Sequence, residues 1–105
     1  MKKKLNFEDL CPALKGIFLL KGKWSMCIIH TLLDGTKRFK ELEREVIGVN
    51  TRMLSKELKF LEKEKIVRRK AYATIPPTVE YSLTEKGKAL ENVIVEIGSW
   101  AEKYA

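Results

Sequence analysis

The sequence predicts an α+β fold that is mostly helical, with about five helices and one two-stranded β-hairpin. Two observations support this expectation. Apolar residues recur at helical spacing in several separate segments. A basic segment rich in strand-forming residues is followed by two prolines and then by a segment of alternating polarity. With 105 residues the chain can bury a core without disulfides or metal, so we expect one domain over residues 1–105.

The first predicted helix lies within residues 8–21. Pro12 suits the first helical position, where its missing N–H costs nothing, so the helix should begin after Cys11. Its apolar residues face more than one direction, which is typical of a helix buried on several sides. In so small a protein this indicates burial against a second subunit. The residues that we expect at this dimer interface are Leu14, Ile17 and Phe18.

The second predicted helix spans residues 24–34 and ends at the Asp34-Gly35 stop signal. Cys27 stands beside two isoleucines, and we expect it to be an inert core thiol. His30 is the only histidine, so we expect a helix-surface or core residue and not a metal ligand. Residues 36–38 are predicted to form a short basic linker.

A helix-turn-helix is predicted over residues 39–63. A short helix over residues 39–46 is followed by a turn that contains Gly48, and a second helix starts at Asn50. Asn50 is a good N-cap because its side-chain oxygen can accept a hydrogen bond from the first turn. The second helix has an apolar seam of Leu54, Leu58 and Leu61, and an opposite basic face of Arg52, Lys56, Lys59 and Lys63.

A β-hairpin is predicted over residues 66–83, with Pro76 and Pro77 in its turn. A hairpin that follows a helix-turn-helix makes the fold a winged helix. The last helix should start at Thr84 and run to about residue 104. Its apolar stripe is broader than one small core needs, which is typical of a helix that packs on a partner. The stripe residues expected at the dimer interface are Val93, Ile97, Trp100 and Tyr104.

The charge distribution favours an anionic partner. The formal net charge is +7, and residues 50–70 contain eight basic and three acidic residues. DNA presents closely spaced phosphates, and a protein that neutralises them releases counterions. The major groove is wide enough for one α-helix, whose N-terminal residues meet base edges. We therefore expect double-stranded DNA as the partner.

The expected DNA contacts fall into three groups. Residues for the major groove are Asn50, Thr51, Arg52, Ser55 and Lys56, with Arg52 suited to a bidentate contact with guanine. Residues further along the helix, which we expect to touch phosphates, are Lys59 and Lys63. Residues of the hairpin that could reach the DNA backbone or minor groove are Arg69, Lys70, Thr74 and Thr78.

The chain resembles the HxlR-type regulators, winged-helix repressors and activators related to the MarR group. The resemblance spans nearly the whole chain, and its most specific part is the run PPTVEYSLTEKG after a basic strand. It implies a homodimer held by the first and last helices, a pseudo-palindromic operator and control of transcription. The matching features are Cys11-Pro12, Gly22-Lys23-Trp24, Arg38-Phe39, Glu41-Leu42, Gly48, Leu58, Leu61, Pro76-Pro77, residues 79–84 and Gly87.

Cys11 has two interpretations. At a helix N-terminus the dipole favours a thiolate and so a reactive thiol, although Glu8 and Asp9 act in the opposite direction. The resemblance adds that the matching cysteine is a thiol sensor of oxidants, quinones or aldehydes in some members. The alternative is a small apolar residue at the dimer seam, which free cysteines often are.

Several function classes lack support in the sequence. There is no glycine-rich phosphate loop, metal-ligand cluster or nucleophile–base spacing, so we expect no enzyme, cofactor or metal site. No signal peptide or membrane-spanning run is evident, which predicts a cytoplasmic protein with no membrane partner. The sequence does not identify a small-molecule effector. Two alternatives stay open: a winged-helix module for protein–protein interaction and a non-specific architectural DNA-binding protein.

Overall fold

This computed structural model describes residues 11–105, which form six helices and three strands. The winged-helix prediction is confirmed. Residues 8–10 of the first predicted helix and residues 1–10 of the predicted domain lie outside the described part. The elements are α1 (Pro12–Leu20), α2 (Ser25–Leu32), β1 (Lys37–Arg38), α3 (Phe39–Glu45), α4 (Thr51–Lys63), β2 (Val67–Tyr72), β3 (Thr78–Leu83), α5 (Glu85–Lys88) and α6 (Glu91–Tyr104).

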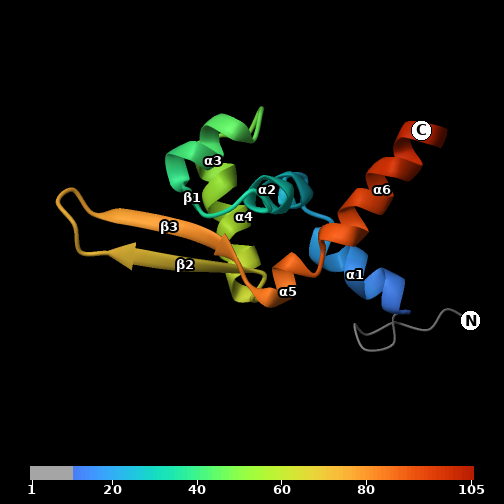
Figure 1. Cartoon of the computed structure of the whole chain (residues 1–105), viewed down its shortest axis with the longest axis horizontal. Coiled ribbons are helices and arrows are strands. Elements are labelled where there is room, and N and C mark those ends of the chain that lie inside the picture. The colour runs from blue at the N-terminus through green and yellow to red at the C-terminus, as the bar shows by residue number, and fades with distance from the viewer. Residues whose placement is uncertain (1–10) are drawn as a thin grey trace, which may run out of the picture.

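The core lies where α2, α3 and α4 meet the base of the β2–β3 hairpin. Ile28 and Ile29 of α2, Leu42 of α3 and Ile66 before β2 are fully buried. Burial of such side chains contributes roughly 1.5–3 kcal/mol each relative to exposure. Figure 1 shows the hairpin extending to one end of the molecule, while α1 and α6 lie at the other end. This arrangement separates the wing from the two helices that we expected at a dimer interface.

The sheet has three strands in the order β1-β3-β2, both pairs antiparallel. The prediction of a two-stranded hairpin with a linker at residues 36–38 was therefore incomplete. Lys37 pairs with Tyr81 and Arg38 with Glu80, so the linker forms β1 along the free edge of β3. A two-residue strand leaves no periodic pattern, and only its partner strand decides that it pairs.

The predicted last helix is split into two. Thr84 caps α5 as expected, since its hydroxyl accepts a hydrogen bond from the amide of Gly87 at 3.1 Å. The Leu90 amide then donates to the Gly87 carbonyl, three residues back, whereas a continuing α-helix would use the carbonyl of residue 86, four residues back. This tighter turn ends α5, which packs on the base of the wing, and α6 starts anew at residue 91.

The prediction that Cys27 is a core thiol was wrong, because its side chain is exposed. The core face of α2 is made by Ile28, Ile29 and Leu32, and Cys27 lies outside it beside His30, which is also exposed. Two adjacent isoleucines already fill the width that a single helix presents to a core. No helix among the described residues is long and apolar enough to span a bilayer.

Candidate nucleic-acid interface

The turn between α3 and α4 is built around a glycine. Gly48 has φ of +91°, a conformation that residues with a side chain rarely adopt. A Cβ at this position would also lie 3.1 Å from the indole ring of Trp24. Asn50 then caps α4 as predicted, since its side-chain oxygen accepts a hydrogen bond from the Met53 amide at 2.8 Å. The turn and the cap together fix where the N-terminus of α4 points.

Helix α4 is amphipathic, and its predicted apolar seam is confirmed. Leu54, Leu58 and Leu61 are at most 2% exposed. The side chains that we expect to contact DNA lie on the other faces. Of these, Asn50, Thr51, Arg52, Lys56, Lys59 and Lys63 are exposed, and Ser55 is half-buried.

Two polar contacts that no sequence pattern predicted hold α4 in place. The Thr51 hydroxyl donates to the carboxylate of Glu43 on α3, so it joins the two helices of the helix-turn-helix. The hydroxyl of Ser25, fully buried at the start of α2, donates to the Glu57 carboxylate at 2.8 Å. Glu57 therefore points toward α2 and not toward the basic face of α4.

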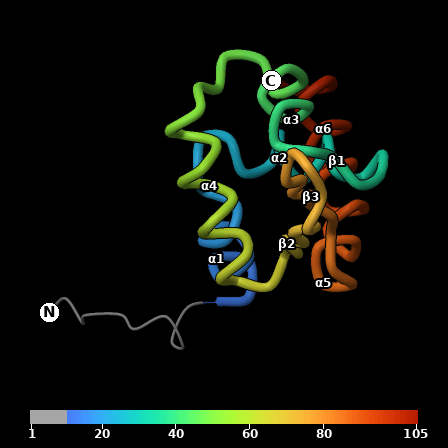
Figure 2. The backbone as a smooth tube through the Cα atoms, turned by 90° about the vertical axis from the view of Figure 1, so that its left-hand side faces the viewer, coloured from blue at the N-terminus to red at the C-terminus, as the bar shows by residue number. Residues whose placement is uncertain are grey.

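The strand register places Arg69 and Lys70 on opposite faces of the wing. Arg69 pairs with Tyr81 and Lys70 with Glu80, and successive side chains in a strand alternate between faces. Arg69 lines an open groove of about 300 Å³ between α4 and β2, together with Ser55 and Lys59. Seen from the wing end in Figure 2, α4 runs along one edge of the molecule with the hairpin beside it. One face of the hairpin therefore continues the basic face of α4.

The tip of the wing is held by threonines. The Thr74 hydroxyl donates to the Pro76 carbonyl at 2.7 Å and lies 2.9 Å from the Thr78 hydroxyl. Both threonines were predicted to reach DNA. Their mutual contact orders the end of the hairpin, which otherwise consists of exposed residues.

The residues predicted at a dimer interface are all exposed in the single chain. On α1, Leu14, Ile17 and Phe18 are 40–58% exposed. On α6 the exposed members are Val93, Ile97, Trp100 and Tyr104, at 42–65%. The rings of the last two stack in a tilted pair, with centroids 5.8 Å apart. Exposed apolar rows on two helices of so small a protein are unusual for the surface of a monomer.

Both cysteines are free and exposed. Cys11 is the N-cap residue of α1, as predicted, but its side chain forms no capping hydrogen bond. Cys27 lies in the middle of α2 at the edge of a second open hollow, together with His30 and Ile47. Within residues 11–105, no group of three potential metal-binding side chains comes together.

Comparison with known proteins identifies strong relatives. The family model described as HxlR-like helix-turn-helix matches residues 19–105. The HTH-type transcriptional regulator YodB of Bacillus subtilis (strain 168) is 43% identical over 98 residues, which are 92% of this chain and 88% of YodB. A structure of quinone-bound YodB superposes with a TM-score of 0.76 at 40% identity, and covers 90% of this chain and 100% of that one.

Two further solved structures share the fold. The redox regulator HypR in its oxidised form has a TM-score of 0.82 at 38% identity, over 90% of this chain and 98% of HypR. A protein of Porphyromonas gingivalis W83, described as a transcriptional regulator of the MarR family, has a TM-score of 0.86 at 34% identity, over 98% of this chain and 100% of its own. The residues that the family model matches contain the helix-turn-helix, the wing and α6, but only the end of α1.

Proposed function

The chain belongs to the HxlR-like helix-turn-helix family of transcriptional regulators, and we propose that it binds a pseudo-palindromic operator as a homodimer. In this proposal α4 of each protomer enters a major groove. A two-fold symmetric dimer reads two half-sites about 34–36 Å apart, one helical turn of DNA. The whole chain, residues 1–105, then acts as one domain with the helix-turn-helix, the wing and two dimerisation helices as its parts.

The observation that carries the proposal is the exposed polar and basic face of α4. Its first turns present Arg52 and Lys56 to solvent, while the leucines of the opposite face are buried in the core. A helix held in this way can enter a groove without giving up its packing. Base edges are read by the N-terminal residues of such a helix, and phosphates by residues further along. Lys59 and Lys63 fit the second role.

The face of the wing next to α4 supports an assignment of Arg69 to the DNA backbone. Arg69 lines the same groove as Ser55 and Lys59, so a strand that passes this groove meets all three. Lys70 lies on the other face of β2, where its ammonium group sits 5.0 Å from the centre of the Tyr72 ring. We therefore rank Arg69 above Lys70 as a DNA contact. Thr74 and Thr78 at the tip remain candidates for the minor groove.

Arg52→Ala tests the assignment of base contacts. We expect a loss of about 1–3 kcal/mol on the operator together with a relaxed sequence preference, because the guanidinium group can pair with two acceptors of one guanine. Both the affinity and the sequence preference are measured by fluorescence anisotropy. The labelled DNA comes from upstream of the gene for this protein and of the neighbouring gene, and random DNA is added as competitor. Lys63→Ala is the comparison, since loss of a phosphate contact should weaken specific and random DNA alike.

The same titration of the unaltered protein separates the competing functions. Binding that survives excess random DNA supports a specific regulator, whereas binding lost to competitor supports an architectural protein. No binding even at low salt would leave a protein–protein interaction module as the better explanation. If Arg52→Ala weakened random DNA as much as operator, Arg52 would have no role in reading bases.

We propose further that Cys11 makes operator binding sensitive to oxidants or electrophiles. The support is its exposed position at the start of α1, the helix that carries part of the apolar row, and the description of HypR as a redox regulator. We expect mild oxidation with hydrogen peroxide, which converts a single thiol to a sulfenic acid and is itself reduced to water, to weaken operator binding several-fold, and Cys11→Ser to abolish the response. Cys27→Ser is the matched control and should respond like the unaltered protein. A Cys11→Ser protein that still responded would exclude Cys11 as the sensor.

A further inference from the structure

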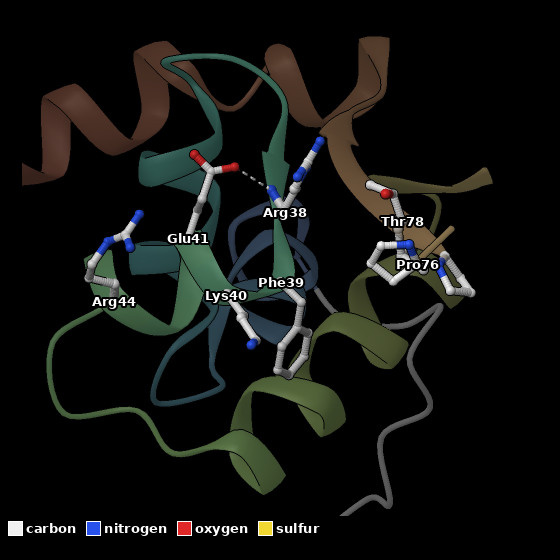
Figure 3. Close-up of a pocket in the computed structure, with 9 residues that line it drawn as sticks. Arg38, Phe39, Lys40, Glu41, Arg44, Pro76 and Thr78 are labelled. Carbon is white, nitrogen blue, oxygen red and sulfur yellow. Dashed lines mark hydrogen bonds between the residues drawn. The ribbon is translucent and has the colours of Figure 1, made fainter. Parts of the chain in front are cut away.

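A third hollow, with several basic residues in its lining, lies between α3 and the tip of the wing. It is open, has a volume of about 1000 Å³, and was not anticipated from the sequence. Figure 3 shows Phe39 and Lys40 on the first turn of α3 and Pro76 and Thr78 on the hairpin opposite. The charged residues of its lining are Arg38, Lys40, Glu41 and Arg44, and its apolar residues include Phe39, Pro77 and Val79.

The charges of α3 are divided between partnered acids and unpartnered bases. Glu41 accepts a hydrogen bond from the Arg38 amide at 2.9 Å, Glu43 from the Thr51 hydroxyl, and Glu45 pairs with Lys37 at 3.2 Å. Lys40 and Arg44 have no carboxylate within 4.0 Å in the described part of the chain. They are one helical turn apart, and both are exposed. Glu41 also lines the hollow and keeps its negative charge, because its hydrogen bond comes from a neutral amide. With Arg38, Lys40 and Arg44 against Glu41, the lining still has a net charge of +2.

The hollow continues the groove between α4 and β2. Val79 lines the hollow and Tyr81 lines the groove, and these residues lie two apart on β3, so they face the same side of the sheet. The Phe39 ring lies against the Tyr81 ring, with centroids 6.5 Å apart. One surface therefore runs from Lys59 and Arg69, past these rings, to Lys40 and Arg44.

We propose that this hollow binds the sugar–phosphate backbone of the same operator, beside the segment that α4 reads. The proposal rests on the proposed DNA-binding function and extends its contact surface. Lys40 and Arg44 neutralise phosphates, and the apolar side chains of Phe39, Pro77 and Val79 pack against deoxyribose. Contacts of this kind position a protein on the duplex and carry no base preference. Continuity with the α4 groove favours this occupant over a small anion.

The experiment compares the salt dependence of operator binding between the unaltered protein and the double variant Lys40→Gln with Arg44→Gln. Each phosphate contact contributes about 0.9 to the slope of log affinity against log salt, so a dimer that loses four contacts should lose up to about 3.6. Preference for operator over random DNA should not change. The matched control is Arg68→Gln with Lys88→Gln, because these residues line a hollow on the other face of the wing.

Ethylation interference locates the contacts directly. For the unaltered protein, ethylation of the phosphates that flank the α4 site should block binding. For the double variant, ethylation of the same phosphates should leave binding unchanged. A double variant with the slope and interference pattern of the control would overturn the proposal while leaving the assignment of α4 intact. If the unaltered protein binds no operator, the proposed function fails, and this inference fails with it. Thermal unfolding of both variants verifies that the fold is preserved.

Discussion

Ile97→Glu is expected to yield a folded monomer that binds the operator roughly 10²- to 10⁴-fold more weakly than the unaltered protein. Ile97 is 42% exposed in the single chain and is not part of its core. A carboxylate there costs the protomer little, but in the proposed dimer it would be buried without a partner. A monomer binds each half-site separately and loses the gain from simultaneous binding of both.

Analytical ultracentrifugation measures the oligomeric state, and anisotropy on the full operator and on a single half-site measures the affinity. Val95→Glu provides the control, because Val95 is 52% exposed on the same helix but lies about 200° around it from Val93. It should remain a dimer with unaltered affinity. An Ile97→Glu protein that stayed dimeric would exclude this stripe of α6 from the interface.

Gly87→Ala is expected to destabilise the fold by about 3 kcal/mol, at the upper end of what overpacking usually costs. A Cβ at this position would lie 2.3 Å from the backbone oxygen of Ile66 and 3.0 Å from a methyl group of Leu83. The Ile66 oxygen also accepts the amide of Thr84 at 3.0 Å. The Ile66 oxygen cannot move away from the added methyl group without breaking the hydrogen bond that joins the start of α5 to the base of the wing.

Urea unfolding measures this effect as a shift of the midpoint. It is done at one fixed protomer concentration, because the stability of the proposed dimer would depend on concentration. Gly98→Ala is the control. It also replaces a glycine within a helix, but an added Cβ there meets nothing within 4 Å, so its stability should stay within roughly 1 kcal/mol of the unaltered protein. Equal midpoints for the two variants would show that α5 can shift to accommodate the methyl group.

The sequence by itself determined the features that arise from neighbours along the chain. The Asn50 cap depends on one side chain and an amide three residues later. The seam of Leu54 and Leu58 depends on a helical period, and β3 on strict alternation. Such patterns can be recognised in the sequence because each is repeated or completed within a few residues. For the same reason the order of helix-turn-helix, hairpin and terminal helix could be predicted from the sequence.

Only the tertiary structure decided the features that depend on a remote partner. Residues 37–38 become a strand because β3 leaves an edge beside them. The terminal helix is divided after Lys88, and the hydrogen bond from the Thr84 amide to the Ile66 carbonyl holds the start of α5 at the base of the wing. Cys27 is exposed because two isoleucines already occupy the core side of α2. The hollow at α3 exists because the pairing of β1 with β3 brings the start of α3 beside the hairpin. Periodicity states which face of an element is apolar, but packing of distant segments decides what each face meets.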